Sequence, residues 1–403
     1  MHDAYLVLAR RSPIGKHGGV LATLRPDDLA ALVMRDVVEA SGVNPADIED
    51  VIWGCANQAG EDNRNVARMA ALLAGLPVSV PGTTINRLCG SGLDAVAQAA
   101  RMVKVGEAQL VLAGGVESMS RAPWVLPKAE RAFAVGSVTA YDTTLGWRFI
   151  NPRLEEAFGS EAMGETAENL AEEYQIARAN QDAFALESHR KAIAAQDSGR
   201  FASEIVSIEL RQRKQRLRVS QDEGPRRDSD AASLAALRPA FRTGGTVTAG
   251  NASSLNDGAA AILVASHSYC QAHGLKPLAK VRSSAVAGVP PRIMGIGPVP
   301  SSRKALQLAN LGLEDMGVIE LNEAFAAQAL AVLQEWQLDP SDPRLNPNGG
   351  AIALGHPLGC SGARILTTLL HEMQRRDDAE FGLATMCIGV GQGIAMVVEK
   401  VSS

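Results

Sequence analysis

The feature that most constrains the fold of this chain is a unit of strand, turn, helix and strand that occurs twice. The first copy begins with an apolar strand at 50–54 and continues with the turn Cys89-Gly-Ser-Gly92. Apolar residues then recur at helical spacing over 93–103, which predicts a helix with one buried face. A second strand is predicted at 110–113, where it ends in a pair of glycines.

The second copy repeats this order. It contains a strand at 318–321, the turn Gly359-Cys-Ser-Gly362, a helical face over 365–373 and a strand at 381–386. Such self-similarity indicates duplication. Because strands alternate with helices in both copies, we expect an α/β fold whose parallel sheets are covered by helices on both faces.

The segment between the two copies differs from them in composition and in predicted secondary structure. Residues 121–250 are rich in charge, alanine, glycine and proline, and helical stretches at 165–175 and 180–195 occur there without alternating strands. We expect an inserted, mainly helical domain, of the kind that often carries a binding surface. The predicted organisation is a first half at 1–120 completed by 251–277, an inserted loop domain at 121–250 and a second half at 278–403.

Composition disfavours several classes of protein. The net charge of −5 gives no basic excess for nucleic acid, and the one basic run, at 211–218, is interpreted as a solvated loop face. The first residues run directly into a strand at 4–9, and apolar runs are too short for a bilayer, so we expect neither a signal peptide nor a membrane span. Five widely spaced cysteines without a C-x-x-C pair argue against a disulfide framework or a zinc site. Reduced thiols in a cytoplasmic protein are the simplest interpretation.

Cys89 is the leading candidate for a nucleophile. It stands just before a predicted helix, where free N–H groups and the positive end of the helix dipole favour thiolate over thiol. The flanking glycines let a ligand approach the backbone closely. A lone cysteine is more commonly a buried structural residue, but the Gly-Ser-Gly turn favours the nucleophile.

Three further segments carry groups that could act beside Cys89. His356, just before the second turn, could deprotonate the thiol or donate a hydrogen bond to a carbonyl oxygen. Cys387, at a strand end, could act as a second acid and base, with the backbone N–H of Gly389 as an oxyanion donor. Asn322 could cap a following helix, or it could hold a water that donates to an enolate oxygen. Taken singly, each of these has an equally simple structural explanation.

The other cysteines and most histidines receive no catalytic role. Cys270 and Cys360 are interpreted as structural, whereas Cys55 follows a strand near a possible pocket. Four histidines in polar contexts are expected to be exposed: His17, His189, His267 and His273.

Six segments together resemble the thiolase family. They are Asn86-Arg-Leu-Cys-Gly-Ser-Gly92, Gly114-Gly-Val-Glu-Ser-Met119, Thr248-Ala-Gly-Asn-Ala-Ser253, Asn322-Glu-Ala-Phe-Ala326, Gly355-His-Pro-Leu-Gly359 and Cys387-Ile-Gly-Val-Gly-Gln-Gly393. The resemblance covers essentially the whole chain, in order. It implies a thiolase fold, which is a duplicated five-layered αβαβα core with an inserted loop domain, and a homotetramer built as a dimer of dimers.

The resemblance also implies roles for the candidate residues. Cys89 is expected to carry the acyl group, with His356 as its activator and as a donor to the thioester oxygen. Cys387 is expected to be the second acid and base, Asn322 to hold a catalytic water, and the N–H groups of Cys89 and Gly389 to form an oxyanion hole. No metal or cofactor is implied, because coenzyme A and acyl-CoA are substrates. The coenzyme A channel in the inserted domain is expected to be lined by Leu154, Met163, Arg226 or its neighbour Arg227, Phe241, Ala249, Ser253 and Phe325.

Three segments narrow the resemblance to the 3-oxoadipyl-CoA thiolases of aromatic-compound breakdown. They are Glu61-Asp-Asn-Arg-Asn-Val-Ala-Arg68, Thr143-Thr-Leu-Gly-Trp-Arg-Phe149 and Pro291-Arg-Ile-Met-Gly295. Such enzymes cleave 3-oxoadipyl-CoA to succinyl-CoA and acetyl-CoA, or run the reverse condensation. The substrate ends in a carboxylate, which requires a cation or a polar pocket, and Arg148 and Arg64 are the candidates.

Three alternatives remain open. The first is a broad-specificity 3-ketoacyl-CoA or acetoacetyl-CoA thiolase; Ala162 stands where short-chain biosynthetic thiolases carry a histidine, which disfavours a dedicated acetoacetyl-CoA enzyme. The second is a decarboxylating ketoacyl synthase, which uses one cysteine and two histidines, so Cys387 counts against it. The third is a non-catalytic acyl-CoA or lipid carrier, which has no need of intact reactive residues. Positions that depart from the pattern of close relatives are Gly164, Ser254-Leu255 and Cys360.

Overall fold

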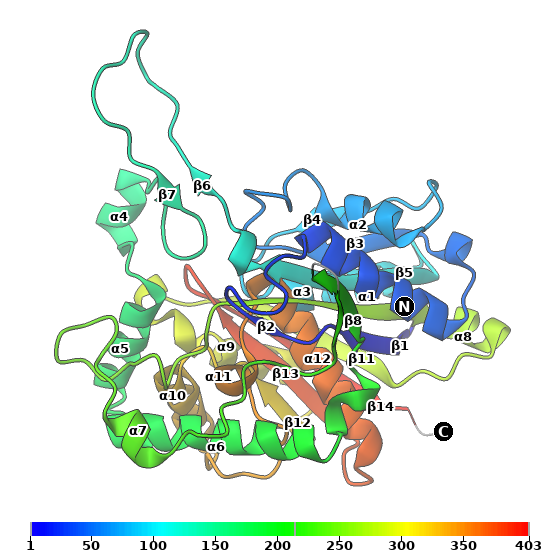
Figure 1. Cartoon of the computed structure of the whole chain (residues 1–403). Coiled ribbons are helices and arrows are strands. Elements are labelled where there is room, and N and C mark those ends of the chain that lie inside the picture. Colours follow the sequence, from blue (N-terminus) through cyan, green and yellow to red (C-terminus); the bar gives the residue numbers. More distant parts are fainter. Residues whose placement is uncertain (1, 213–214, 402–403) are drawn as a thin grey trace.

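The computed structural model describes residues 2–212 and 215–401 (Figure 1). A ten-stranded sheet runs through the molecule. Its strands are β1 (Ala4–Arg11), β2 (Gly15–Lys16), β3 (Asp50–Gly54), β4 (Thr83–Ile85), β5 (Leu110–Ser118), β10 (Asn256–Ser266), β11 (Ala279–Gly288), β12 (Met316–Leu321), β13 (Phe381–Ile388) and β14 (Gln392–Lys400). The strand order is β12-β13-β14-β11-β1-β10-β5-β3-β4, and β2 pairs with β10. The two halves of the sheet join where Tyr5 and Leu6 of β1 pair with Lys280 and Ala279 of β11.

The sheet is mixed, so the prediction of parallel sheets was only partly right. β3 is parallel to β4 and to β5, and β12 is parallel to β13, as the alternation of strands and helices predicts. In contrast, β10 and β14 run antiparallel to their neighbours. β13 and β14 are joined directly by the short turn 389–391, and a connection of that length produces an antiparallel pair.

Helices and sheet halves form five layers. α1 (Pro26–Ser41) and α2 (Val66–Ala74) pack on the outer face of the first half, and α9 (Pro298–Ala309) and α10 (Ala326–Trp336) pack on that of the second. Between the halves lie α3 (Ser91–Val105) and α12 (Leu358–Arg375), which share one buried core with strands from both halves. The predicted αβαβα architecture is therefore confirmed.

The two central helices contact each other through reciprocal glycines. A Cβ at Gly92 would lie 2.8 Å from the backbone nitrogen of Ala363, and a Cβ at Gly362 would collide with the backbone nitrogen of Leu93. In each case the contact is with the residue that follows the other glycine. This relation is what two copies of one unit produce when they face each other, and it requires residues without a side chain.

The predicted end of the second strand in the first copy was wrong. The strand expected to end at 113 continues as β5 through Gly114 and Gly115 to Ser118. Position 115 needs a glycine inside the strand, because a Cβ there would collide with the carbonyl oxygen of Gly359, at the start of α12. The glycines mark a close approach between backbones rather than a turn.

The regular elements between β5 and β10 are mostly helices, with two short hairpins, and long irregular stretches join them. These elements are η2 (Met119–Arg121), β6 (Trp124–Val125), β7 (Tyr141–Asp142), α4 (Pro152–Phe158), α5 (Met163–Glu173), α6 (Arg178–Asp197), η3 (Arg200–Ser203), β8 (Ile208–Gln212), β9 (Gln215–Val219) and α7 (Ala231–Ala235). The predicted helices at 165–175 and 180–195 correspond to α5 and α6. The segment that includes β6 and β7 projects from the body of the molecule (Figure 1).

The described part of the basic run at 211–218 belongs to the β8–β9 hairpin rather than to a loop, whereas its residues Arg213 and Lys214 lie outside the described residues. The remaining elements are η1 (Pro45–Asp47), α8 (His267–His273), η4 (Pro291–Ile296) and α11 (Ala351–Leu354). Within the described part of the chain, none of the helices has the length and apolar character needed to span a membrane.

Candidate active site

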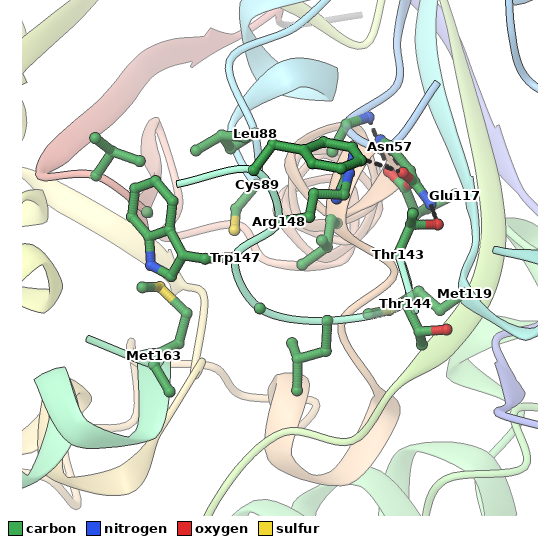
Figure 2. Close-up of a pocket in the computed structure, with 18 residues that line it drawn as sticks. Asn57, Leu88, Cys89, Glu117, Met119, Thr143, Thr144, Trp147, Arg148 and Met163 are labelled. Carbon is green, nitrogen blue, oxygen red and sulfur yellow. Dashed lines mark hydrogen bonds between the residues drawn. The ribbon is translucent and has the colours of Figure 1, made fainter. Parts of the chain in front are cut away.

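A cavity of about 460 Å³ lies where the two halves and the inserted segment meet. Cys89 and Glu117 come from the first half, residues 143–149 and Met163 from the inserted segment, and Gly389 from the turn after β13. Figure 2 shows Cys89 beside this cavity, with Glu117 well away from Met163 across it. The cavity therefore brings together residues that are far apart in the sequence.

Cys89 stands one residue before the N-cap of α3, as the sequence predicts. The hydroxyl of Ser91 closes the turn, because it accepts the N–H of Arg87 at 2.8 Å and donates to the carbonyl of Leu88 at 2.6 Å. Burial raises the pKa of Cys89 to about 11, and hydrogen bonds from the backbone N–H groups of Gly389 and of Cys89 itself oppose that rise. The resting sulfur is thus a thiol at neutral pH and needs a base.

Cys387, at the end of β13, lies within the electrostatic range of Cys89. Burial is the main cause that raises the pKa of Cys387, and the charge of a Cys89 thiolate raises it further. Cys387 belongs to a buried apolar cluster with Phe325, against which the half-buried Met163 packs. An apolar surrounding of this kind keeps the thiol protonated until a reaction removes its proton.

His356 is buried just before α12, and burial, aided by the charge of Arg364, lowers its pKa to about 3. Its Nδ1 lies 2.6 Å from the hydroxyl of Ser361, which itself donates to the carbonyl of Pro357 at 3.0 Å. With its hydrogen directed to Pro357, the hydroxyl oxygen accepts from Nδ1, and the imidazole proton then stands on Nδ1. His356 is therefore a neutral imidazole whose Nε2 can accept a proton.

Asn322 follows β12 and is fully buried. It does not cap a helix, because α10 begins at Ala326 with Phe325 as its N-cap, so that predicted role was wrong. Its backbone N–H donates to Thr385 at 3.0 Å, whereas neither side-chain amide atom finds a partner among the described residues. Buried polar atoms in this situation are commonly satisfied by ordered water.

The residues expected along the coenzyme A channel fall into two groups. Phe241 packs edge-on against Phe325 with ring centroids 6.1 Å apart, and the hydroxyl of Ser253 donates to Ala324 at 2.9 Å, so this group lies around the cluster that contains Cys387. Ala249 lines a second cavity, of about 240 Å³.

Arg226 lines the same second cavity, together with Lys16 and His17, whereas Arg227 is paired with Asp197 at 2.9 Å. Leu154 is half-buried on α4 and is not among the residues that line either cavity.

The two candidate arginines lie in different surroundings. Arg148 lines the cavity that contains Cys89. Arg64 is exposed and does not line that cavity, which corrects the prediction that it faces the substrate. The reason is local: Arg64 has a φ of 66°, and the next residue, Asn65, caps α2 through Arg68. Arg64 thus stands in a turn on the surface, two residues before α2 begins.

Sequence reasoning missed several supporting residues. Glu117 is fully buried and accepts the backbone N–H groups of Ala56 at 2.9 Å and Gly359 at 2.8 Å. Burial raises its pKa to about 7 against the effect of these hydrogen bonds. Asn256 accepts the backbone N–H of His356 at 2.9 Å. Glu117 lies in a segment that carries the family resemblance, and Asn256 closely follows another. Their position in the sequence could therefore have pointed to them.

Ser361 was also missed, although it occupies the place in the second turn that Ser91 occupies in the first. A further correction concerns His189, which was expected to be exposed. It is buried, and its Nδ1 accepts the backbone N–H of Arg226 at 3.2 Å.

Comparison with known proteins identifies the family of this chain. The chain matches the thiolase N-terminal domain over residues 4–268 and the thiolase C-terminal domain over residues 275–400. It is 54% identical over 403 residues to the 3-oxoadipyl-CoA/3-oxo-5,6-dehydrosuberyl-CoA thiolase of Escherichia coli and to a beta-ketoadipyl-CoA thiolase of Acinetobacter baylyi, with 100% of each chain covered. The crystal structure of the Bacillus anthracis acetyl-CoA acetyltransferase is similar, with a TM-score of 0.94, 44% identity, and coverage of 100% of this chain and 99% of that one. Matches to two adjoining thiolase domains, which together cover nearly the whole chain, establish that this chain belongs to the thiolase family.

Proposed function

We propose that this protein is an acyltransferase that cleaves 3-oxoadipyl-CoA with coenzyme A into succinyl-CoA and acetyl-CoA, or catalyses the reverse condensation. The observation that carries the proposal is the presence of Arg148 and Cys89 in one cavity. A cation beside the nucleophile suits an acyl group that ends in a carboxylate. The names of two relatives that are 54% identical over the full chain point to the same substrate.

In the first stage, Cys89 passes its proton to Nε2 of His356 and attacks the 3-keto carbon. The backbone N–H groups of Cys89 and Gly389 hold the oxyanion, an arrangement supported by the lowering effect that both N–H groups have on the pKa of Cys89. The bond to the α-carbon then breaks, and the departing enolate of acetyl-CoA takes a proton from Cys387. His356 and a water held by Asn322 donate to the thioester oxygen while the enolate exists.

In the second stage, the thiol of coenzyme A gives its proton to the Cys387 thiolate and attacks the acyl group on Cys89. The shortened acyl-CoA leaves, and the Cys89 thiolate recovers its proton from His356. Each cycle thus returns both cysteines to the thiol form, and the covalent intermediate predicts ping-pong kinetics.

Coenzyme A binding is proposed for the inserted domain, residues 121–250, between a first half at 1–120 with 251–277 and a second half at 278–403. The pantetheine arm would pass Leu154, Met163, Phe241, Ala249, Ser253 and Phe325. The phosphates would meet Arg226, which is supported by the two further basic side chains, Lys16 and His17, that line its cavity.

A homotetramer, as a dimer of dimers, is proposed for the assembly. Its support is the projecting segment that contains β6 and β7, on which Phe133 is 99% and Val135 98% exposed. Exposed apolar side chains of this size favour burial against another chain. A cytoplasmic location is proposed because the five cysteines are free thiols.

The test is a comparison of kcat/KM for 3-oxoadipyl-CoA, acetoacetyl-CoA and a longer 3-ketoacyl-CoA, each with free coenzyme A, by the release of acetyl-CoA. We expect the six-carbon diacid substrate to be preferred and Cys89→Ala to abolish turnover. Preference for either monocarboxylic substrate would favour the broad-specificity alternative. No turnover with any substrate would favour a carrier.

A further inference from the structure

The guanidinium of Arg148 has one protein partner in the described part of the chain. Its Nη2 donates to the side-chain oxygen Oδ1 of Asn57 at 3.0 Å, and no carboxylate of the described residues lies within ion-pair distance of it. Arg148 is half-buried and lines the cavity beside Cys89. A guanidinium has five N–H donors, so most of them are available to a ligand in that cavity.

The orientation of the Asn57 amide follows from its other partners. The amide nitrogen Nδ2 donates to the hydroxyl of Thr143 at 3.1 Å, and that hydroxyl donates to the carbonyl of Pro123 at 2.7 Å. Because the hydroxyl hydrogen of Thr143 is donated to Pro123, the hydroxyl can only accept a hydrogen bond from Asn57. The amide oxygen must therefore face Arg148, which is the arrangement that accepts an N–H from a cation.

The backbone of Asn57 is also held by a hydrogen bond. Its N–H donates to Oε1 of the buried Glu117 at 3.1 Å, and Oε2 of the same carboxylate accepts the N–H of Gly359 at the start of α12 at 2.8 Å. Figure 2 shows Asn57, Glu117 and Thr143 grouped on one side of the cavity. Arg148 is thus connected, through two residues, to the helix that follows His356.

We infer that Asn57 is a positioning residue that orients Arg148 toward the terminal carboxylate of the acyl group, an inference that rests on the proposed function. Bidentate pairing of a guanidinium with a carboxylate requires both planes to be aligned. A neutral amide can hold one edge of the guanidinium without cancelling its charge. Aspartate would have nearly the same shape but would neutralise Arg148 and repel the substrate.

The difference in charge between an amide and a carboxylate at position 57 allows the inference to be tested by mutation. We compare Asn57→Asp, Asn57→Ala and Arg148→Met with the control Arg64→Met, which removes an exposed arginine from the neighbouring loop. For each protein, kcat and KM are measured with 3-oxoadipyl-CoA and with acetoacetyl-CoA, which has no terminal carboxylate. Thermal unfolding of each variant checks that the fold is intact.

We expect Asn57→Asp to lower kcat/KM for 3-oxoadipyl-CoA by about tenfold or more, mainly through KM, and to change it for acetoacetyl-CoA by less than about twofold. Asn57→Ala should lower it less than Asn57→Asp, because the cation survives. Combining Asn57→Asp with Arg148→Met should add little to Arg148→Met alone, because both act on one interaction. Arg64→Met should leave both substrates unaffected.

Equal losses of Asn57→Asp on both substrates would show a merely structural role and overturn the inference. So would fully additive losses in the double variant. If the unmodified enzyme prefers 3-oxoadipyl-CoA but Asn57→Asp keeps that preference, the inference alone fails. If the unmodified enzyme shows no preference for the diacid, the proposed function and this inference fail together, since no carboxylate is then being recognised.

Discussion

Removing the hydroxyl of Ser361 tests how His356 is prepared to accept a proton. Ser361 stands in the first turn of α12, and its hydroxyl links Nδ1 of His356, at 2.6 Å, to the carbonyl of Pro357, at 3.0 Å. This link fixes the proton on Nδ1 and leaves Nε2 as the basic atom. In Ser361→Ala the buried Nδ1–H loses its acceptor, and the imidazole can exchange tautomers or rotate.

The size of the effect follows from the burial of this hydrogen bond. Leaving a buried donor without a partner costs roughly 1–3 kcal/mol. If that cost is met by reorienting the imidazole before each turnover, kcat falls roughly five- to a hundredfold. KM should change little, because Ser361 faces His356 rather than the cavity that contains Cys89.

The assay is steady-state thiolysis with separate kcat and KM, supported by the rate of Cys89 alkylation by iodoacetamide. Thr367→Val is the matched control, because Thr367 is a buried residue of the same helix whose hydroxyl donates to the carbonyl four residues earlier, at 2.9 Å. The reasoning is refuted if Ser361→Ala keeps the kcat of the unmodified enzyme, or if Thr367→Val loses as much.

Three further changes probe other parts of the molecule. Gly362→Ala should lower the free energy of unfolding in denaturant by about 1–3 kcal/mol, because its Cβ would collide with the backbone of α3 and force two packed helices apart. Glu117→Gln should remove a pH dependence of stability: burial raises the pKa of Glu117 from 4.5 to about 7, so the folded protein keeps a proton that the unfolded chain releases, and the associated stability, complete below pH 4.5, is lost as the pH rises through 7. Denaturation at several pH values between 4 and 8 measures this. Gly164→Ala would place a methyl group against the ring of Phe241, and we expect a higher KM for coenzyme A with little change in kcat.

Each of these expectations has an outcome that contradicts it. Gly288→Ala, whose Cβ would meet its nearest neighbour at 3.9 Å, is the control for the helix contact, and equal stability of the two variants would remove the argument from packing. Parallel stability curves for the unmodified protein and Glu117→Gln would mean that Glu117 titrates normally. An unchanged KM in Gly164→Ala would separate Phe241 from the coenzyme A channel.

The sequence predicted the features that local patterns determine. Cys89 could be placed before a helix because glycines and helical periodicity surround it. The alternation of strands and helices predicted sheets covered by helices, whereas the five-layered arrangement was implied by the family resemblance. Strand direction was harder, because it depends on how the chain returns to the sheet, and the direct hairpin between β13 and β14 leaves no signal in residue spacing.

Contacts between distant segments could not be predicted from local sequence patterns. The hydrogen bond from Arg148 to Asn57 joins residues 91 positions apart. Arg64 and Arg148 look equally suitable as cations in the sequence, and only the structure shows that Arg64 is exposed whereas Arg148 lines the cavity. Ser361 was within reach, because its counterpart Ser91 lies in the other copy of the turn.

Of the two repeated turns, only the first has room for a nucleophilic sulfur at its leading position. The position that corresponds to Cys89 in the second copy is Gly359, where a Cβ would lie 2.8 Å from a carboxylate oxygen of Glu117 and 2.8 Å from the Cα of Cys55. A cysteine there would break the bridge that Glu117 makes to α12. The two halves therefore cannot be identical at this position. The first copy carries the nucleophile Cys89, whereas the second copy carries Gly359, whose backbone N–H binds Glu117.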